Sequence, residues 1–418
     1  MQKIWMLSVA TATLLLAQEM SAESIAEQLE NEKTTTATKS GFMPDISLIV
    51  DVGYTKERLD FDDHHLEIPS LVHGGGDAHD GHAHTKLAGN DGFSLNYAEL
   101  TIGASVDNYF DLMSVFHLSE DDFEIEEAYA TTTGLPYHLK AKIGKFKSDF
   151  GYLNAKHQHN YNFAEAPLVY LALLGDHGIN EEGIQLQYIL PTSIYMMAGV
   201  ELLRGENEQS FGTEAFLEVD EVSQPSLWLG YLKTSFDIAE GTLLAGVSMA
   251  TGESRIDHLE DMENPHAFAG DTTLYGIDLV YKKYFSANNA ITWQSEYLYR
   301  EMDGNQYKPD NSAIELNKKQ SGFYSELIYQ YDKNYRAGVR YSAITQNDVV
   351  ANDKEKEIPD DLFVVSTMLE YHFSEYSRLR LQYNHNSSLY NEEGIKNNKN
   401  EILLQFTYAI GAHGAHSF

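Results

Sequence analysis

Histidines and carboxylates are concentrated in one stretch of the sequence. Six of the 17 histidines lie between His64 and His84, among aspartates and glycines. Neutral imidazoles and carboxylates are ligands that zinc takes in proteins, and a glycine-rich segment can fold around an ion at little steric cost. We interpret this segment as a metal-capturing loop, and a solvated polar loop without metal is the alternative. The candidate ligands are His64, His65, His73, Asp77, His79, Asp80, His82 and His84.

A second pair of histidines is formed by His157 and His159. Side chains two residues apart point the same way in an extended segment, so the pair could share an ion; a structural role is equally open. The residues that follow, from Phe163 to Leu174, are too apolar for a loop in water. We expect this loop to pack inside the protein or across its mouth.

Two further sets of charged residues are predicted to line an interior. Glu124 and Glu126 share one face of a predicted strand, and antiparallel pairing can bring them to Lys140 and Lys142 on the next strand. Such walls would polarise a bore and select ions, whereas cross-strand ion pairs in a wet lumen are the alternative reading. The other set is basic and lies on neighbouring outward-running strands: Arg336, Arg340, Arg378 and Arg380.

Composition excludes several classes of protein. The chain has 418 residues, no cysteine, and 63 acidic against 29 basic side chains, a net charge of −34. Without thiols it has no disulfides, cysteine-type zinc module or catalytic cysteine, and its acidity argues against nucleic acid as a partner. No nucleotide loop, nucleophile elbow or His-Glu-x-x-His motif occurs. We therefore expect no enzyme and no required cofactor, with Zn²⁺ as a transported or loop-bound ion.

The elements that must position these residues are strands with a hydrophobic period of two. In Glu401 to Gly411, apolar residues occupy every second position and alternate with residues such as Gln405 and Thr407. About sixteen such strands are predicted, an even number as barrel closure requires. Their expected starts are Asp45, Phe93, Tyr109, Phe123, Leu139, Gly183, Ile194, Ser226, Thr242, Thr273, Ala290, Gly322, Tyr335, Leu362, Arg378 and Glu401.

The connections between these strands are alternately short and mostly long. Turns such as Pro191 to Ser193 are short, whereas Tyr152 to Glu182, Thr251 to Asp271 and Asp303 to Ser321 are long. This rhythm is typical of outer-membrane barrels, which have short periplasmic turns and long extracellular loops. The fold class predicted is therefore an all-β, antiparallel transmembrane β-barrel with an aqueous bore and both termini in the periplasm.

The N-terminus indicates export. Residues 1–22 read as a signal peptide, with Lys3 before an apolar stretch and a small residue before the expected cut. Residues 23–44 form a periplasmic segment in which Ile25 and Leu29 predict a short amphipathic helix. Residues 45–418 then make one barrel domain.

The sequence resembles a known family, the zinc-regulated outer-membrane proteins, often labelled TonB-dependent receptors and related in architecture to phosphate-selective porins. The matching stretches are Met43 to Ile49, the histidine-rich loop, Glu126 to Tyr129, Gly144 to Asn154 with His157 and His159, Ala166 to Tyr170, and Ile410 to Phe418. The resemblance implies an outer-membrane transporter or porin for zinc, with His157, His159, His413 and His416 on motif positions.

The predicted function is a porin-like channel in the outer membrane of a Gram-negative bacterium, with divalent-metal uptake helped by the histidine-rich loop. A general or anion-preferring porin without a metal role is one alternative. A surface adhesin or metal-binding barrel with an occluded bore is the other. The expected partners are outer-membrane lipid, the barrel-assembly machinery and, by analogy with porins of this size, two further copies in a homotrimer.

Overall fold

The fold is seen in a computed structural model, which describes residues 44–61, 66–73, 87, 91–118, 123–207, 209–261, 264–359, 361–391 and 393–411. The signal peptide, the segment before Pro44, His413 and His416 lie outside the described residues. The same holds for all candidate ligands of the histidine-rich loop except the backbone of His73. The described parts of the chain contain no helix long and apolar enough to cross a membrane.

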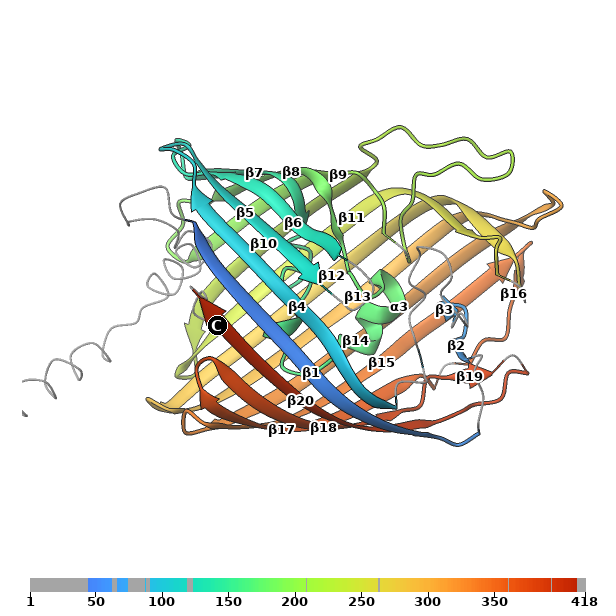
Figure 1. Ribbon diagram of the computed structural model, residues 1–418. Coiled ribbons are helices and arrows are strands. Elements are labelled where there is room, and N and C mark those ends of the chain that lie inside the picture. The colour runs from blue at the N-terminus through green and yellow to red at the C-terminus, as the bar shows by residue number, and fades with distance from the viewer. Residues whose placement is uncertain are drawn as a thin grey trace, which may run out of the picture.

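The strands form one closed antiparallel barrel, seen from the side in Figure 1. Pairing of β1 with both β4 and β20 closes the ring, which has 16 strands. The strands of the ring are β1 (Asp45–Leu59), β4 (Gly92–Ser105), β5 (Phe110–Leu118), β6 (Phe123–Thr132), β7 (Leu139–Lys147), β8 (Asn180–Ile189), β9 (Tyr195–Leu203), β10 (Leu227–Ile238), β11 (Gly241–His258), β12 (His266–Ser286), β13 (Asn289–Tyr307), β14 (Ala313–Tyr331), β15 (Tyr335–Ala351), β17 (Phe363–Ser374), β18 (Ser377–Asn386) and β20 (Lys399–Gly411).

The predicted fold class is confirmed, because the period of two separates an outer apolar face from an inner polar one. On β20, Leu404 is 43% exposed on the outside while its neighbour Gln405 is buried on the inside. Lipid offers no partner to a backbone amide, so only a closed sheet of this kind satisfies every strand. The chain thus has the architecture of a transmembrane β-barrel of the Gram-negative outer membrane.

Two predicted long connections are wrong. Residues Thr251 to Asp271 and Asp303 to Ser321 are mostly strand, since β11 and β12 pair as far as His258 and His266 and β13 and β14 pair as far as Tyr307 and Ala313. The reason is that these hairpins continue as ladders beyond the apolar band, where polar residues replace the alternating pattern. Between β15 and β17, the two-residue strand β16 (Lys354–Glu355) extends the hairpin in the same way.

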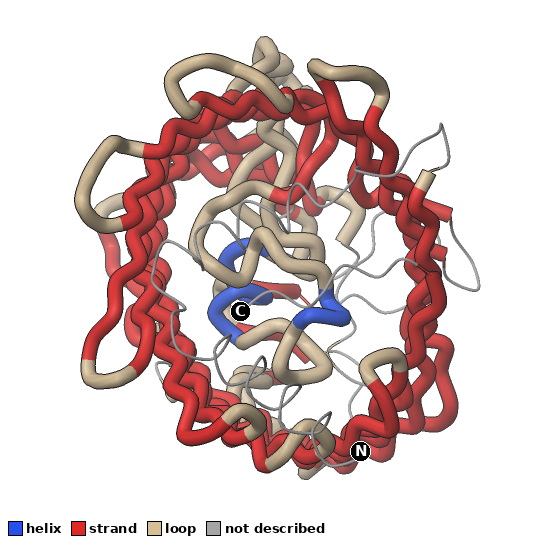
Figure 2. Tube along the Cα trace, turned by 90° about the vertical axis from the view of Figure 1, so that its left-hand side faces the viewer, coloured by secondary structure: helices blue, strands red, loops and turns tan. Residues whose placement is uncertain are grey.

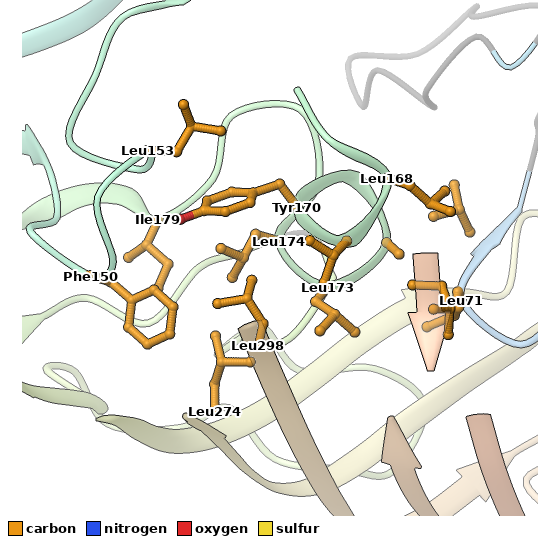
Figure 3. Packing of buried hydrophobic residues seen from close by; sticks show 14 of the residues in the cluster. Leu71, Phe150, Leu153, Leu168, Tyr170, Leu173, Leu174, Ile179, Leu274 and Leu298 are labelled. Atoms are coloured by element: carbon orange, nitrogen blue, oxygen red, sulfur yellow. The ribbon is translucent and has the colours of Figure 1, made fainter. Parts of the chain in front are cut away.

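The interior of the barrel is filled by the segment between β7 and β8, residues 148–179, which we call the inward segment (Figure 2). It contains the 3-10 helix η1 (Gln158–Asn160) and the helix α3 (Leu168–Leu174). Six of the seven residues of α3 are buried, in contact with wall residues such as Leu274 and Leu298 (Figure 3). Each fully buried leucine stabilises this packing by about 1.5 to 3 kcal/mol. The prediction that this apolar loop packs inside the protein is confirmed.

A small sheet covers α3 on the side of the long loops. It consists of β2 (Leu66–Ile68), β3 (Val72–His73) and β19 (Tyr390–Asn391), which come from the first and last long loops. Buried side chains of this cap sheet join the same hydrophobic cluster as α3: Leu66, Ile68, Val72 and Tyr390. In Figure 1 the sheet lies toward the end of the barrel away from the C-terminus.

Candidate functional site

The inward segment is held in place by two buried wall glutamates. Glu201 on β9 accepts hydrogen bonds from the Ser148 hydroxyl at 2.6 Å and the Asp149 amide at 3.0 Å. Glu296 on β13 accepts bonds from the Tyr152 and Leu153 amides, both at 2.9 Å, and from the Tyr170 hydroxyl at 2.7 Å. Hydrogen bonds to a carboxylate are stronger than neutral ones, so these two residues fix where the segment leaves the wall.

This placement builds a cluster of two imidazoles and three carboxylates, which we call the His–Glu cluster: Glu99, Glu126, Glu127, His157 and His159. The His157 ring reaches Glu127 through Nε2 at 2.9 Å and Glu126 through Nδ1 at 3.2 Å. The same Nδ1 lies 3.5 Å from Glu99. Both ring nitrogens of His157 therefore face carboxylate oxygens.

His159 completes the cluster from the next turn of the inward segment. Its Nδ1 lies 3.0 Å from the Glu99 carboxylate, and its ring stacks on that of His157 with centroids 5.7 Å apart. The two histidines thus lie side by side and both contact the carboxylate of Glu99, although the segment forms the 3-10 helix η1 rather than the extended stretch assumed from the sequence.

The cluster has the composition and spacing of a divalent-cation site. Ligand atoms of Glu99, Glu126 and His157 all lie within 4.8 Å of one another, and Glu127 and His159 stand beside them. Imidazole nitrogen and carboxylate oxygen form a donor set that zinc and similar cations accept. Binding of such an ion would require His157 to release its proton, because imidazole ligates only when neutral.

The charge of His157 is set by its neighbours. Burial alone would lower the pKa of this imidazole, but the carboxylates of Glu99 and Glu126 and its hydrogen bonds to Glu126 and Glu127 raise the pKa well above the ordinary value. A doubly protonated ring also matches the geometry, since each nitrogen can then donate to a carboxylate. The raised pKa favours the protonated form of His157, in which the ring bridges the glutamates.

The predicted pairing of Glu124 and Glu126 with Lys140 and Lys142 is wrong. The register of β6 and β7 places Lys142 opposite Thr131, near the short turn. At the other end, Glu124 pairs with Lys145 at 3.0 Å and Glu126 with Lys147 at 3.1 Å. A short connection between the two strands sets the register from the turn outward, and the glutamates lie too far along β6 to meet the predicted lysines.

The four predicted arginines do face the interior, where each one holds the inward segment. Arg378 donates to the His159 carbonyl at 2.8 Å, Arg380 to that of Tyr161 at 3.0 Å and Arg340 to that of Glu165 at 2.8 Å. Arg336 donates to the Asn162 side chain. Three of them, Arg336, Arg378 and Arg380, also surround Glu370 on β17. They clamp the inward segment to the wall, and Arg336 and Arg378 also line a cavity inside the barrel.

Three participants were missed from the sequence: Glu99, Glu127 and Lys147. Glu99 lies on β4 in phase with buried Tyr97, so the inward phase of that strand was the available signal. Glu127 was hidden by a β-bulge, because Val115 and Phe116 of β5 pair with Glu127 and Ile125 and leave Glu126 as an extra residue. Unbroken alternation would send consecutive side chains to opposite faces, whereas the bulge directs both glutamates toward His157.

Two cavities lie beneath the inward segment, at the end of the barrel that carries the short turns. One has a volume of about 310 Å³ and is lined by His159, Lys333 and Arg378 among others. The second, of about 380 Å³, lies beside β7 to β12. Tyr152 and Lys156 line both cavities, so they stand between them.

Comparison with known proteins gives one relative by sequence and several by fold. No family model matches the chain. An uncharacterised protein of Aquifex aeolicus (strain VF5) is 44% identical over 398 residues, covering 94% of this chain and 83% of that protein. The chain belongs to the family of this Aquifex protein.

The structural neighbours are outer-membrane barrels. A loop-deletion mutant of OmpT, an outer-membrane protein of Vibrio cholerae, matches with a TM-score of 0.51 and 14% identity over 89% of this chain and 100% of that chain. The anion-selective porin of Comamonas acidovorans matches with a TM-score of 0.50 and 12% identity over 88% and 100% of the two chains. The outer-membrane channel DcaP of Acinetobacter baumannii has the same TM-score and identity over 90% and 99%. These likenesses show a porin fold.

Proposed function

We propose that this protein is a porin-like outer-membrane channel for small solutes and ions that binds zinc or another divalent metal on its way through the barrel. The observation that supports the metal role is the His–Glu cluster, where Glu99, Glu126 and His157 bring three ligand atoms within 4.8 Å of one another. The stability of a barrel does not require three ligand atoms to lie so close together in its lumen. Ionisable groups inside a membrane protein commonly mark ion pathways. His159 belongs to the cluster and also lines a cavity, which connects the site to space inside the barrel.

The histidine-rich loop belongs to the same proposal as an outer capture site. Strand β3 ends at His73, and the residues from Gly74 onward carry Asp77, His79, Asp80, His82 and His84. Because β3 belongs to the cap sheet, the loop starts directly above α3. Metal collected there would enter close to the inward segment.

Conductance and zinc flux test the proposal together. Purified protein in planar bilayers should conduct, and proteoliposomes containing a zinc-sensitive dye should take up zinc faster than empty liposomes. The variant Glu126→Gln, with Glu99→Gln, should slow zinc uptake while leaving chloride flux unchanged. Glu253→Gln is a matched control, because that carboxylate lies on β11 and pairs with Arg255 away from the cluster. Equal zinc uptake by the cluster variant and the control would show that the His–Glu cluster does not lie on the zinc pathway.

Deletion of residues 74–85 tests the outer capture site separately and leaves β3 intact. The deletion should remove a class of zinc sites whose affinity falls as the pH drops from about 7 to 5, because protons compete for imidazole. Isothermal titration of the intact and shortened proteins measures this. If both bind the same amount of zinc with the same pH dependence, the loop is only a solvated connection.

An anion-preferring channel is the second candidate, favoured by the basic residues around the cavity of about 310 Å³: Lys156, Lys282, Lys333, Arg336 and Arg378. Reversal potentials in a salt gradient separate the two candidates by their sign. A barrel that never conducts would favour the third reading, a metal-binding or adhesive surface protein. Outer-membrane lipid, the assembly machinery and a homotrimer are the partners that we propose.

A further inference from the structure

The cavity of about 380 Å³ beneath the inward segment has the properties of a small-molecule site. Its volume lies within the range of about 300 to 1,000 Å³ that is usual for ligand pockets. Turn residues such as Leu135 and His138 line it, which places it at the periplasmic end of the barrel. It is separate from the His–Glu cluster, none of whose residues lines it.

One wall of the cavity is apolar, although barrel lumens are normally polar. Ile189, Met197 and Leu244 line the cavity from three strands. Other lumen-facing apolar residues, such as Leu274 and Leu298, are fully buried against α3. Ile189 and Leu244 are only half-buried and face the cavity instead. This wall suits the apolar body of a ligand.

Lysines lie beside this apolar wall, since Lys233 on β10 pairs directly with Met197 on β9. Lys140, Lys156 and Lys233 line the cavity, against two carboxylates, in a chain whose net charge is −34. Lys233 donates to the Gly151 carbonyl at 2.7 Å, and an ammonium group carries three donors. The inward segment therefore holds this lysine at the cavity with capacity to bind a carboxylate.

The two carboxylates differ in a way that points to a ligand. Asp149 accepts hydrogen bonds at 2.8 Å from the side chains of Gln185 and Gln187. Asp278 is only 3% exposed, and its Oδ1 has no hydrogen-bond partner among the described residues. This oxygen occupies the space above Gly246, where a larger residue would collide with it. Asp278 also lines the cavity, so a ligand ammonium group bound there would offset the cost of burying this carboxylate.

We infer that this cavity binds a small apolar α-amino acid from the periplasmic side. The ligand carboxylate meets Lys233, its ammonium group meets Asp278 two strands away, and its side chain packs on Ile189, Met197 and Leu244. Inorganic phosphate would leave the apolar wall unused, and a simple carboxylic acid would leave Asp278 without a donor. The inference does not depend on metal binding.

Titration calorimetry of the full-length protein in detergent tests the inference with three probes. L-phenylalanine carries both charges and the apolar body, phenylacetate lacks the ammonium group, and phenethylamine lacks the carboxylate. Phenylalanine should bind saturably and at least about tenfold more tightly than either fragment, because each charged hydrogen bond contributes about that factor. Absence of saturable binding, equal affinity for a fragment, or complete displacement by inorganic phosphate alone would overturn the inference.

Three substitutions assign the contacts. Lys233→Gln should weaken phenylalanine and phenylacetate by about tenfold but not phenethylamine, and Asp278→Asn should weaken phenylalanine and phenethylamine but not phenylacetate. Leu244→Trp fills the cavity and should abolish binding of all three. Lys333→Gln is the matched control, since Lys333 lines only the neighbouring cavity of the two. If Asp278→Asn fails to fold, the other two variants still decide, because unchanged phenylalanine binding by both would disprove the site.

Discussion

A single extra residue at Glu126 determines which side chains meet inside the barrel. The bulge opposite Val115 and Phe116 turns Glu126 and Glu127 toward the same imidazole, which binds one carboxylate with each ring nitrogen. Bulges of this kind commonly re-aim side chains beside functional sites. At the scale of the residue, the cluster thus depends on a local irregularity of β6.

His157 should make the stability of the protein depend on pH. Its pKa is raised above that of the unfolded chain, about 6.5, so its ion pairs stabilise the fold fully below that pH and are lost as pH rises through the folded pKa. His157→Gln should cost about 3 to 5 kcal/mol at pH 6 and progressively less at alkaline pH. Urea unfolding followed by gel mobility at a series of pH values measures this.

His385 provides the control for that experiment. Its Nδ1 lies 3.0 Å from the amide oxygen of Asn400 rather than from a carboxylate. His385→Gln removes a histidine without breaking an ion pair to a carboxylate, so the loss of about 3 to 5 kcal/mol expected of His157→Gln at pH 6 should not appear. A loss in His157→Gln that is the same at every pH would show that the imidazolium ion pairs contribute nothing.

At the scale of the element, β20 separates the lipid face from the lumen face by one residue. Leu404→Arg places a charge on the outer, exposed face, whereas Leu403→Arg places the same charge on the inner face of the same strand. The first should destabilise the barrel by about 2 to 4 kcal/mol more than the second if it lies near the membrane midplane. Folding yield into lipid vesicles provides the measurement, and equal yields would mean that the two faces are exchanged.

The inward segment should control conductance through its anchor at Glu296. Glu296→Ala removes the acceptor for the Tyr152 and Leu153 amides and for the Tyr170 hydroxyl. We expect the segment to leave the wall more often, which raises single-channel conductance and its fluctuation. Glu301→Ala on the same strand is the control, because Glu301 pairs with Lys319 instead. Identical conductance of the two variants would show that the inward segment does not restrict the conducting path.

Sequence patterns predicted the strands better than the site. The starts of β1, β6, β7 and β15 agree to the residue, because period-two alternation depends only on neighbouring positions. The apolar residues around α3 likewise predicted that this segment is buried. The charge pairs were wrong because they depend on register, and Glu127 was missed because a bulge has no signature in alternation. The sequence did not predict the anchors Glu201 and Glu296, because they contact the inward segment from strands that are distant in the sequence.

At the scale of the whole molecule, net charge should govern selectivity. The chain carries a net charge of −34, which favours the approach of cations over anions within a distance set by screening. The Debye length falls from about 30 Å at 0.01 M salt to about 3 Å at 1 M. Cation preference, measured as reversal potential across a fixed salt ratio, should decline over that range. A preference independent of salt would place selectivity in local contacts inside the barrel.

The cap sheet also bears on the order in which the parts of the protein fold. Its strands β2 and β19 come from the first and last long loops, so the pairing of Tyr390 with Glu67 joins segments more than 300 residues apart. Contacts between such distant segments form late, because the loop between them must close first. The interior therefore stays uncovered on one side until the final hairpin inserts. We therefore expect the permeability of the barrel to fall last during assembly, when the cap sheet forms over α3.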